Sequence, residues 1–86
     1  MHEAGLMRGL MARIEAEAHK AQAIEVTRVR VWLGALSQMT PGHFAEHFHQ
    51  VAPGTLAARA ALECECSDDP FHPDAADVRL VSIDVR

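Results

Sequence analysis

The sequence predicts an α+β fold in which two helices pack on one face of a small three-stranded mixed sheet, in the order α-β-α-β-β. Three observations predict it. Two segments repeat apolar residues at helical spacing, and three others read as short strands. The chain has 86 residues, which is too short for a second layer of helices. We therefore expect a single domain over residues 1–86.

The first helix is predicted from an apolar stripe that begins near the start of the chain. Its residues recur at i, i+4 spacing and are Leu6, Leu10, Ile14 and Ala18, with Met7 and Met11 beside them. Charged side chains fill the other faces, which is typical of an amphipathic helix. The stripe fades near Lys20.

A change of period then predicts a strand within Ile24–Leu36. Apolar Val29, Val31 and Leu33 alternate there with Arg28, Arg30 and Trp32. Such alternation is typical of a half-buried strand. Gly34 lies near its end and indicates a bulge or a close approach of another backbone.

The second helix is predicted between two proline signals. Thr40 is a natural N-cap, Pro41 suits the first helical position, and Pro53-Gly54 ends the helix. Its core stripe is Phe44, Phe48 and Val51.

Two further strands are predicted at Ala58–Cys66 and Asp77–Val85, joined by a polar connection over residues 67–77. With both helices on one face, the core should include Leu10, Ile14, Val29, Val31, Leu33, Phe44 and Phe48. The small sheet has free edges, which would allow a homodimer with the connection as a hinge.

Composition excludes several classes of protein. A net charge of −4 and a pI near 5.8 argue against a nucleic-acid partner. No apolar run approaches the roughly 20 residues that span a bilayer. Glu3 and Arg8 interrupt any signal sequence, and two cysteines make no disulfide framework. We expect a cytoplasmic protein that contacts no membrane.

The chain begins Met1-His2-Glu3, which offers a metal site. A free α-amine, the His2 imidazole and deprotonated backbone amides can close adjacent chelate rings around one ion. Such nitrogen donors in a square plane suit Ni(II) or Cu(II). The alternative is that His2 is a solvent-exposed residue leading a helix, which the motif taken alone favours.

The stretch from His43 to His47 spells H-x-x-E-H, the inverted zinc-protease signature. On a helix the two histidines would share a face, with Glu46 beside them, and could reach one ion. A hydrolase also needs a third ligand and a cleft, for which this chain has little material. We favour a solvated, histidine-rich helix face.

A third candidate is Cys64-x-Cys66 with His72 six residues later. The thiols could begin a metal site, but a second C-x-x-C pair is missing, so we expect no structural zinc. The favoured interpretation is that the cysteines are small core hydrophobes.

Taken together, four segments resemble one known family over nearly the whole chain. They are Met1-His2-Glu3, "VTRVRVWLGALSQMTPGHFAEHF", "APGTLAARAALECE" and "VRLVSIDVR". In this order they resemble the nickel-insertion accessory proteins of NiFe-hydrogenase maturation, the HypA/HybF family. The stretch "HFAEHF" is similar to that family's second helix, which removes most of the case for a protease.

The resemblance implies a nickel metallochaperone and not an enzyme. Nickel would be held by the Met1 amine, the His2 imidazole and backbone amides up to Glu3. The implied partners are a nickel-binding GTPase and the hydrogenase large subunit, and some family members also serve urease.

One departure from the family is large. The family carries a zinc domain with two C-x-x-C pairs before the last strand, whereas residues 67–77 are far too short to hold one. Cys64 and Cys66 match neither pair. The alternative function is therefore a paralogue without the zinc domain that acts as a non-metal adaptor or regulatory binding protein in hydrogenase maturation.

Overall fold

The computed structural model describes residues 2–86, with side chains from Ala4 onward. Its elements are α1 (His2–Lys20), β1 (Val26–Leu33), α2 (Pro41–Val51), β2 (Ala61–Cys66) and β3 (Val78–Val85). The strand order is β2-β1-β3, with β1 parallel to β2 and antiparallel to β3. The α+β class and the mixed three-stranded sheet are confirmed.

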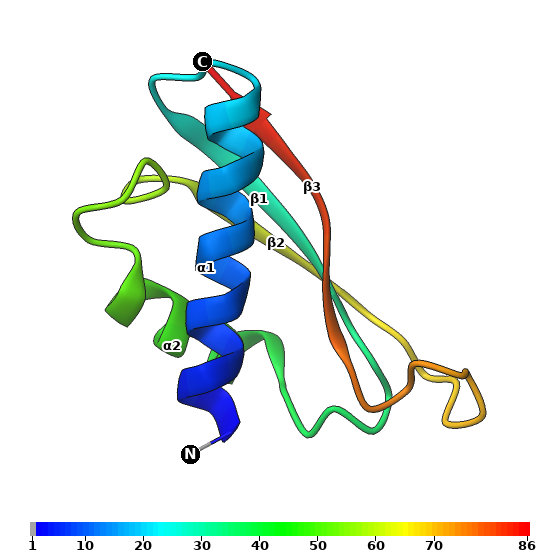
Figure 1. The fold of residues 1–86 in the computed structure, drawn as a ribbon. Helices are drawn as coiled ribbons and strands as arrows, with labels where there is room; N and C mark the ends of the chain where they lie inside the picture. The colour runs from blue at the N-terminus through cyan, green and yellow to red at the C-terminus, as the bar shows by residue number, and fades with distance from the viewer. Residues whose placement is uncertain (1) are drawn as a thin grey trace.

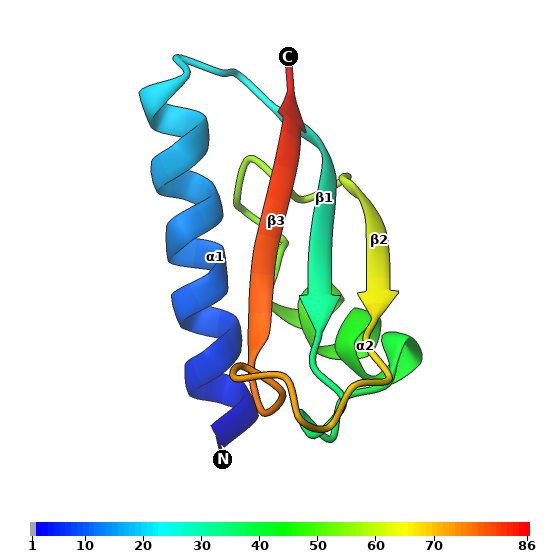
Figure 2. The same ribbon diagram turned by 90° about the vertical axis from the view of Figure 1, so that its right-hand side faces the viewer.

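Both helices lie on the same side of the sheet (Figure 1). α1 runs along β3 and packs against α2, which lies behind β1 and β2. Figure 2 shows the other face of the sheet turned toward the viewer, with no helix over it. The predicted packing of the helices on one face is confirmed.

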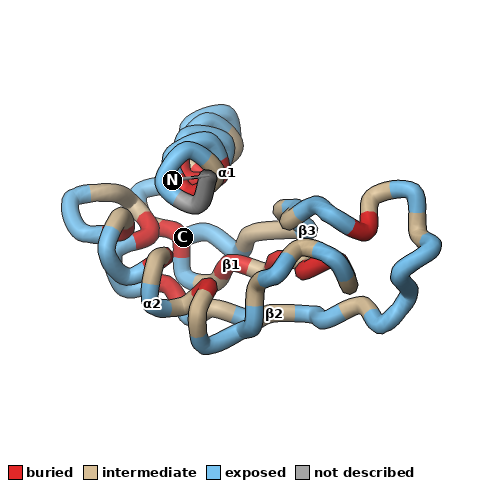
Figure 3. Tube along the Cα trace, turned by 90° about the horizontal axis from the view of Figure 1, so that it is seen from below, coloured by how far each residue is buried: buried red, intermediate tan, exposed pale blue. Residues whose placement is uncertain are grey.

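The hydrophobic core lies between the helices and the sheet, where the buried stretches of the chain gather (Figure 3). It contains all seven predicted core residues, which are Leu10, Ile14, Val29, Val31, Leu33, Phe44 and Phe48. Burying a side chain of this size contributes about 1.5–3 kcal/mol, whereas an exposed ion pair contributes about 0–1 kcal/mol. The apolar layer therefore dominates the stability of the fold.

The ends of α2 follow the predicted signals. Thr40 has an extended backbone (φ −91°, ψ 159°), and its hydroxyl accepts a hydrogen bond from the His43 N–H at 3.1 Å. Pro41 is the first helical residue. The helix closes with the Ala52 N–H donating to the Phe48 carbonyl at 3.0 Å, just before Pro53.

All three strands are shorter than predicted. β1 ends at Leu33 because the Gly34 N–H donates to the Asp77 carbonyl at 2.9 Å, as the connection folds back. A Cβ added to Gly34 would lie 2.2 Å from the Ala75 oxygen, so the predicted close backbone approach is confirmed. β2 begins only at Ala61, because residues 55–60 form successive turns.

β3 contains an irregularity that the alternation of residues does not reveal. Its pairing with β1 passes from Arg30–Ser82 to Val31–Leu80, so Val81 is an extra residue on β3. The Val81 side chain is 55% exposed, although Leu80 and Ile83 on either side pack against the core.

Among the described helices, none is both long and apolar enough to cross a bilayer.

Candidate metal centre

The predicted terminal site lies at the start of α1. Met1 and the side chains of His2 and Glu3 lie outside the described residues, so this site stays a prediction. The helix begins at His2, and among its described side chains Met7, which is 1% exposed, is the first that is buried. Five residues are less than two turns of helix. The start of α1 therefore lies less than two turns from a side chain in the core.

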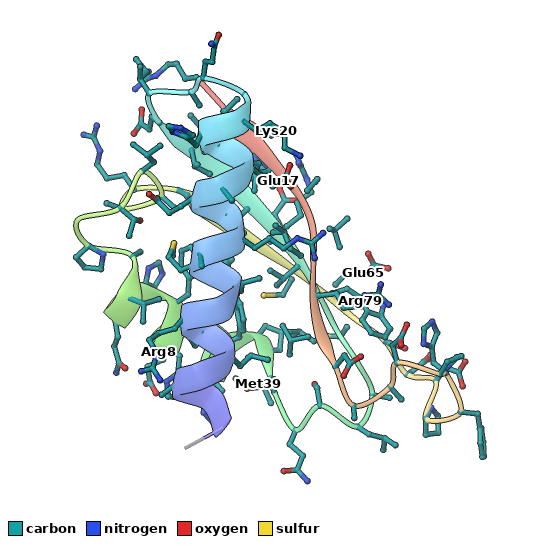
Figure 4. The ribbon with its side chains drawn as sticks, viewed as in Figure 1. Arg8, Glu17, Lys20, Met39, Glu65 and Arg79 are labelled. Atoms are coloured by element: carbon teal, nitrogen blue, oxygen red, sulfur yellow. The ribbon has the colours of Figure 1, made fainter. Side chains whose placement is uncertain are left out.

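A polar contact fixes the other half of α1. A Glu15 carboxylate oxygen accepts a hydrogen bond from the Leu56 N–H at 2.8 Å. Glu17 and Lys20 project from the same half of the helix, where they form an ion pair of 4.0 Å (Figure 4). Glu15 thus ties α1 to the turn before β2, on top of its apolar packing.

His43 and His47 lie one turn apart on α2 and face each other. Their Nε2 atoms are 2.9 Å apart, and the rings stack with centroids 4.7 Å apart and planes 28° apart. Both side chains are half-buried, whereas the neighbouring Glu46 is exposed. At this distance one ring donates its Nε2 proton and the other accepts it. The predicted sharing of a helix face is confirmed.

The pair is not part of a larger ligand cluster within the described part of the chain. No group of three or more His, Cys, Asp or Glu side chains there could hold a metal ion together. The inverted zinc-protease signature therefore obtains no third protein ligand from residues 4–86. What the described residues offer is a two-nitrogen site.

The two cysteines are separated by their exposure. Cys64 is half-buried and packs against the core, and burial, helped by the neighbouring Cys66, raises the pKa of its thiol. Cys66 is exposed at the end of β2, and both thiols are free. The interpretation as core hydrophobes holds for Cys64 and is wrong for Cys66. The raised pKa leaves less of the Cys64 thiol as thiolate, which is its reactive form.

His72 is engaged elsewhere. Its ring lies 4.9 Å from the Trp32 ring, and its Nδ1 accepts a hydrogen bond from the Asp74 N–H at 2.9 Å. Trp32 alternates with buried Val31 and Leu33, so it lies on the open face of the sheet. Cys64 packs on the core side, so the strand separates it from His72.

The connection over residues 67–77 is short and tied at both ends. The Ser67 N–H donates to the Leu33 carbonyl at 2.9 Å, and the Leu36 N–H donates to the Ala75 carbonyl at 2.7 Å. Ala75 is buried at 4% exposure. This loop therefore packs against the end of β1 and continues directly into β3.

The open face of the sheet carries a charged cluster that sequence reasoning missed. Arg30 binds Asp84 through two bonds, Nη1–Oδ1 at 2.9 Å and Nη2–Oδ2 at 3.1 Å. Arg30 also contacts Glu63 at 3.2 Å, and Arg28 pairs with Glu63. Glu65 and Arg79 lie on the same side, away from the helices (Figure 4). The alternating arginines were the available signal, but their partners depend on the register between strands.

These pairs shift the titration of their members. The hydrogen bond to Asp84 raises the pKa of Arg30, and the same bond lowers the pKa of Asp84. The hydrogen bond from Arg28 lowers the pKa of Glu63. The cluster therefore keeps both carboxylates ionised to lower pH than usual.

Comparison with known proteins decides the family. The sequence pattern described as "Hydrogenase/urease nickel incorporation, metallochaperone, hypA" matches residues 1–71. The chain belongs to the HypA family. The resemblance carried by the Met1-His2-Glu3 start and the "HFAEHF" helix is thereby confirmed.

Individual HypA proteins agree with this assignment. The hydrogenase maturation factor HypA of Bradyrhizobium sp. strain ORS 278 is 40% identical over 63 residues, which are 73% of this chain and 56% of that protein. HypA of Picosynechococcus sp. strain PCC 7002 is 33% identical over 82 residues, or 85% of this chain and 73% of that protein. The chain thus spans little more than half the length of the first of these relatives.

The fold is also found among solved structures. The solution structure of the Ni metallochaperone HypA from Helicobacter pylori superimposes with a TM-score of 0.80 and 22% sequence identity. The match covers 96% of this chain and 96% of that chain. At this identity the likeness establishes a shared fold.

Proposed function

We propose that this HypA-family chain is a nickel-binding metallochaperone for the maturation of NiFe hydrogenase, and that it is not an enzyme. The observation that carries the proposal is the family match, which begins at Met1 and so includes the Met1-His2-Glu3 start. The relatives named above are hydrogenase maturation factors. The proposed cargo is Ni²⁺, which the protein receives and passes on unchanged.

The proposed nickel ligands are the Met1 amine, the His2 imidazole and the backbone amides up to Glu3. Nitrogen donors that are close in sequence form adjacent five- and six-membered rings, and a square-planar set of this kind suits Ni(II). Such a site needs no metal-binding pocket in the fold. The helix α1, which packs on the core, follows directly after this site in the chain.

The proposed partners are a nickel-binding GTPase and the hydrogenase large subunit, and urease is a second proposed client because the family description names it. We propose that residues 1–86 form one nickel-binding domain, with residues 67–77 in place of a zinc domain, and that the domain holds no structural zinc. The missing second C-x-x-C pair supports the last point, since a closed zinc site takes four ligands.

Nickel titration of the untagged protein tests the terminal site. We expect one tight equivalent of Ni(II) per chain and a diamagnetic, yellow complex, since that colour and spin state indicate square-planar nitrogen ligation. His2→Ala should abolish this complex and leave the circular dichroism spectrum unchanged, because position 2 lies outside the apolar stripe that begins at Leu6. An unchanged yellow complex in His2→Ala would refute the assignment.

A further inference from the structure

The side chains of His43 and His47 form a second place where a metal ion can bind. They are the two histidines of the H-x-x-E-H motif, which plays no part in the proposed terminal site. The rings come from consecutive turns of α2, and their Nε2 atoms point at the same spot, 2.9 Å apart. Both rings are half-buried, so they are held by their surroundings and yet reach solvent.

The separation of the two nitrogens is that of a hydrogen bond, and it can be compared with the separations that different ion geometries require. With metal–nitrogen bonds of about 2.0–2.1 Å, two ligands at a right angle lie about 2.9 Å apart. At the tetrahedral angle they lie about 3.3–3.4 Å apart. The observed 2.9 Å therefore fits the right angle of octahedral or square-planar ions better than the tetrahedral angle of structural zinc.

We infer that His43 and His47 form a bidentate site for a first-row divalent ion with a preference for imidazole, with Ni(II) as the best fit. To bind the ion through both Nε2 atoms, the donor ring gives up its Nε2 proton to solvent and takes one up on Nδ1. Each neutral ring then carries its single proton on Nδ1. Because protons compete for the same nitrogens, binding weakens in acid.

The position of the site suits an ion that must be passed on. Within residues 4–86 no third side-chain ligand joins the pair, so an ion bound there takes only two ligands from this part of the chain. α2 and the start of α1 lie at the same end of the molecule (Figures 1 and 2). The site itself does not depend on the terminal site, whereas nickel as its natural cargo rests on the function proposed above.

The test uses full-length His2→Ala protein, in which the terminal site is disabled, and nickel chloride as the probe. We expect this protein to bind one equivalent of Ni(II) as a pale, paramagnetic complex, which indicates octahedral ligation. Adding His43→Gln or His47→Gln should weaken nickel binding at least about ten-fold. Even the loss of a group that only hydrogen-bonds to a metal ligand lowers metal affinity by about that factor. Glutamine keeps a good helix former at each position.

The matched control is His49→Gln, a third histidine on the same helix that is exposed and packs edge-on against Phe48 with ring centroids 5.8 Å apart. It should leave the affinity unchanged. Nickel should also raise the thermal midpoint of the His2→Ala protein but not that of His2→Ala/His43→Gln, because a ligand stabilises the state that binds it. Equal affinity in all three glutamine variants, or no binding in the His2→Ala protein, would overturn the inference. Neither result would count against the terminal site.

Discussion

The terminus of α1 and the histidine pair of α2 differ in what holds their ligands together. In the proposed terminal site, covalent connectivity alone keeps the amine, the amides and the imidazole within reach of one ion. In the pair, three residues of chain separate the ligands, and only the turn of α2 brings their Nε2 atoms to 2.9 Å. The geometry of the first site depends on the order of residues along the chain, and that of the second depends on the folded helix.

This difference means that the two sites respond differently to damage. A terminal chelate survives unfolding of the domain, as a short peptide would. The two histidines of the pair move apart when α2 unwinds. Unfolding of the domain unwinds α2, because an isolated helix of 11 residues is marginal in water. Changes to the fold are therefore expected to affect the pair and not the terminal site.

Phe48→Ala should have the largest effect. Phe48 is fully buried between α2 and the sheet, and truncating a buried phenylalanine costs about 3–5 kcal/mol. That is a large part of the roughly 5–15 kcal/mol that stabilises a whole domain. Urea titration should show the loss, and nickel titration at a urea concentration that unfolds only the variant should lose the pale complex and keep the yellow one. Loss of the yellow complex instead would mean that the terminal site needs the fold.

Thr40→Ala should have a smaller effect on the same helix. The Thr40 hydroxyl caps α2 by accepting from the His43 N–H, and loss of an N-cap costs about 1 kcal/mol. We expect the midpoint of urea unfolding to fall by that amount. Nickel affinity at the pair should fall with it, because fraying of the first turn displaces His43. Thr40→Ser, which keeps the oxygen, is the control and should behave like the unaltered protein.

Mild acid should release nickel from both sites before it affects the fold. The lowered pKa values of Glu63 and Asp84 mean that their stabilising contribution is present above the ordinary values of 4.5 and 3.8. It is lost only as the pH falls through the lowered values of the folded state. Imidazole takes up protons between about pH 8 and 5. Nickel release with an unchanged circular dichroism signal is therefore expected near pH 5. Simultaneous loss of both signals would contradict it.

Much of this fold could be predicted because the helices and strands are set by local patterns of residue types. The stripe from Leu10 to Ile14, the alternation around Val31 and the cap at Thr40 each have a local physical cause. The extra residue Val81 and the pairing of Arg30 with Asp84 could not be predicted, since both depend on how β3 aligns with β1. The exposure of Cys66 was missed for a similar reason, because it lies at the end of its strand.

The candidate sites divide in the same way. The i, i+4 spacing predicts that His43 and His47 share a helix face, but the 2.9 Å separation depends on rotamers that no sequence pattern specifies. The motif Met1-His2-Glu3 taken alone favours a plain helix start. The match of residues 1–71 to the HypA family is the reason for proposing it as a nickel site.

The proposal that the free amine of Met1 and the His2 imidazole bind nickel is tested with two forms of the protein that differ only before Met1. One has its native terminus, and the other carries a short extension of glycine and serine, which moves the free amine away from His2. Both are titrated with Ni(II) and followed by ultraviolet–visible absorption. The account predicts the yellow square-planar complex in the native form and only the pale complex in the extended form. The same complex in both forms, lost only in His43→Gln, would contradict it.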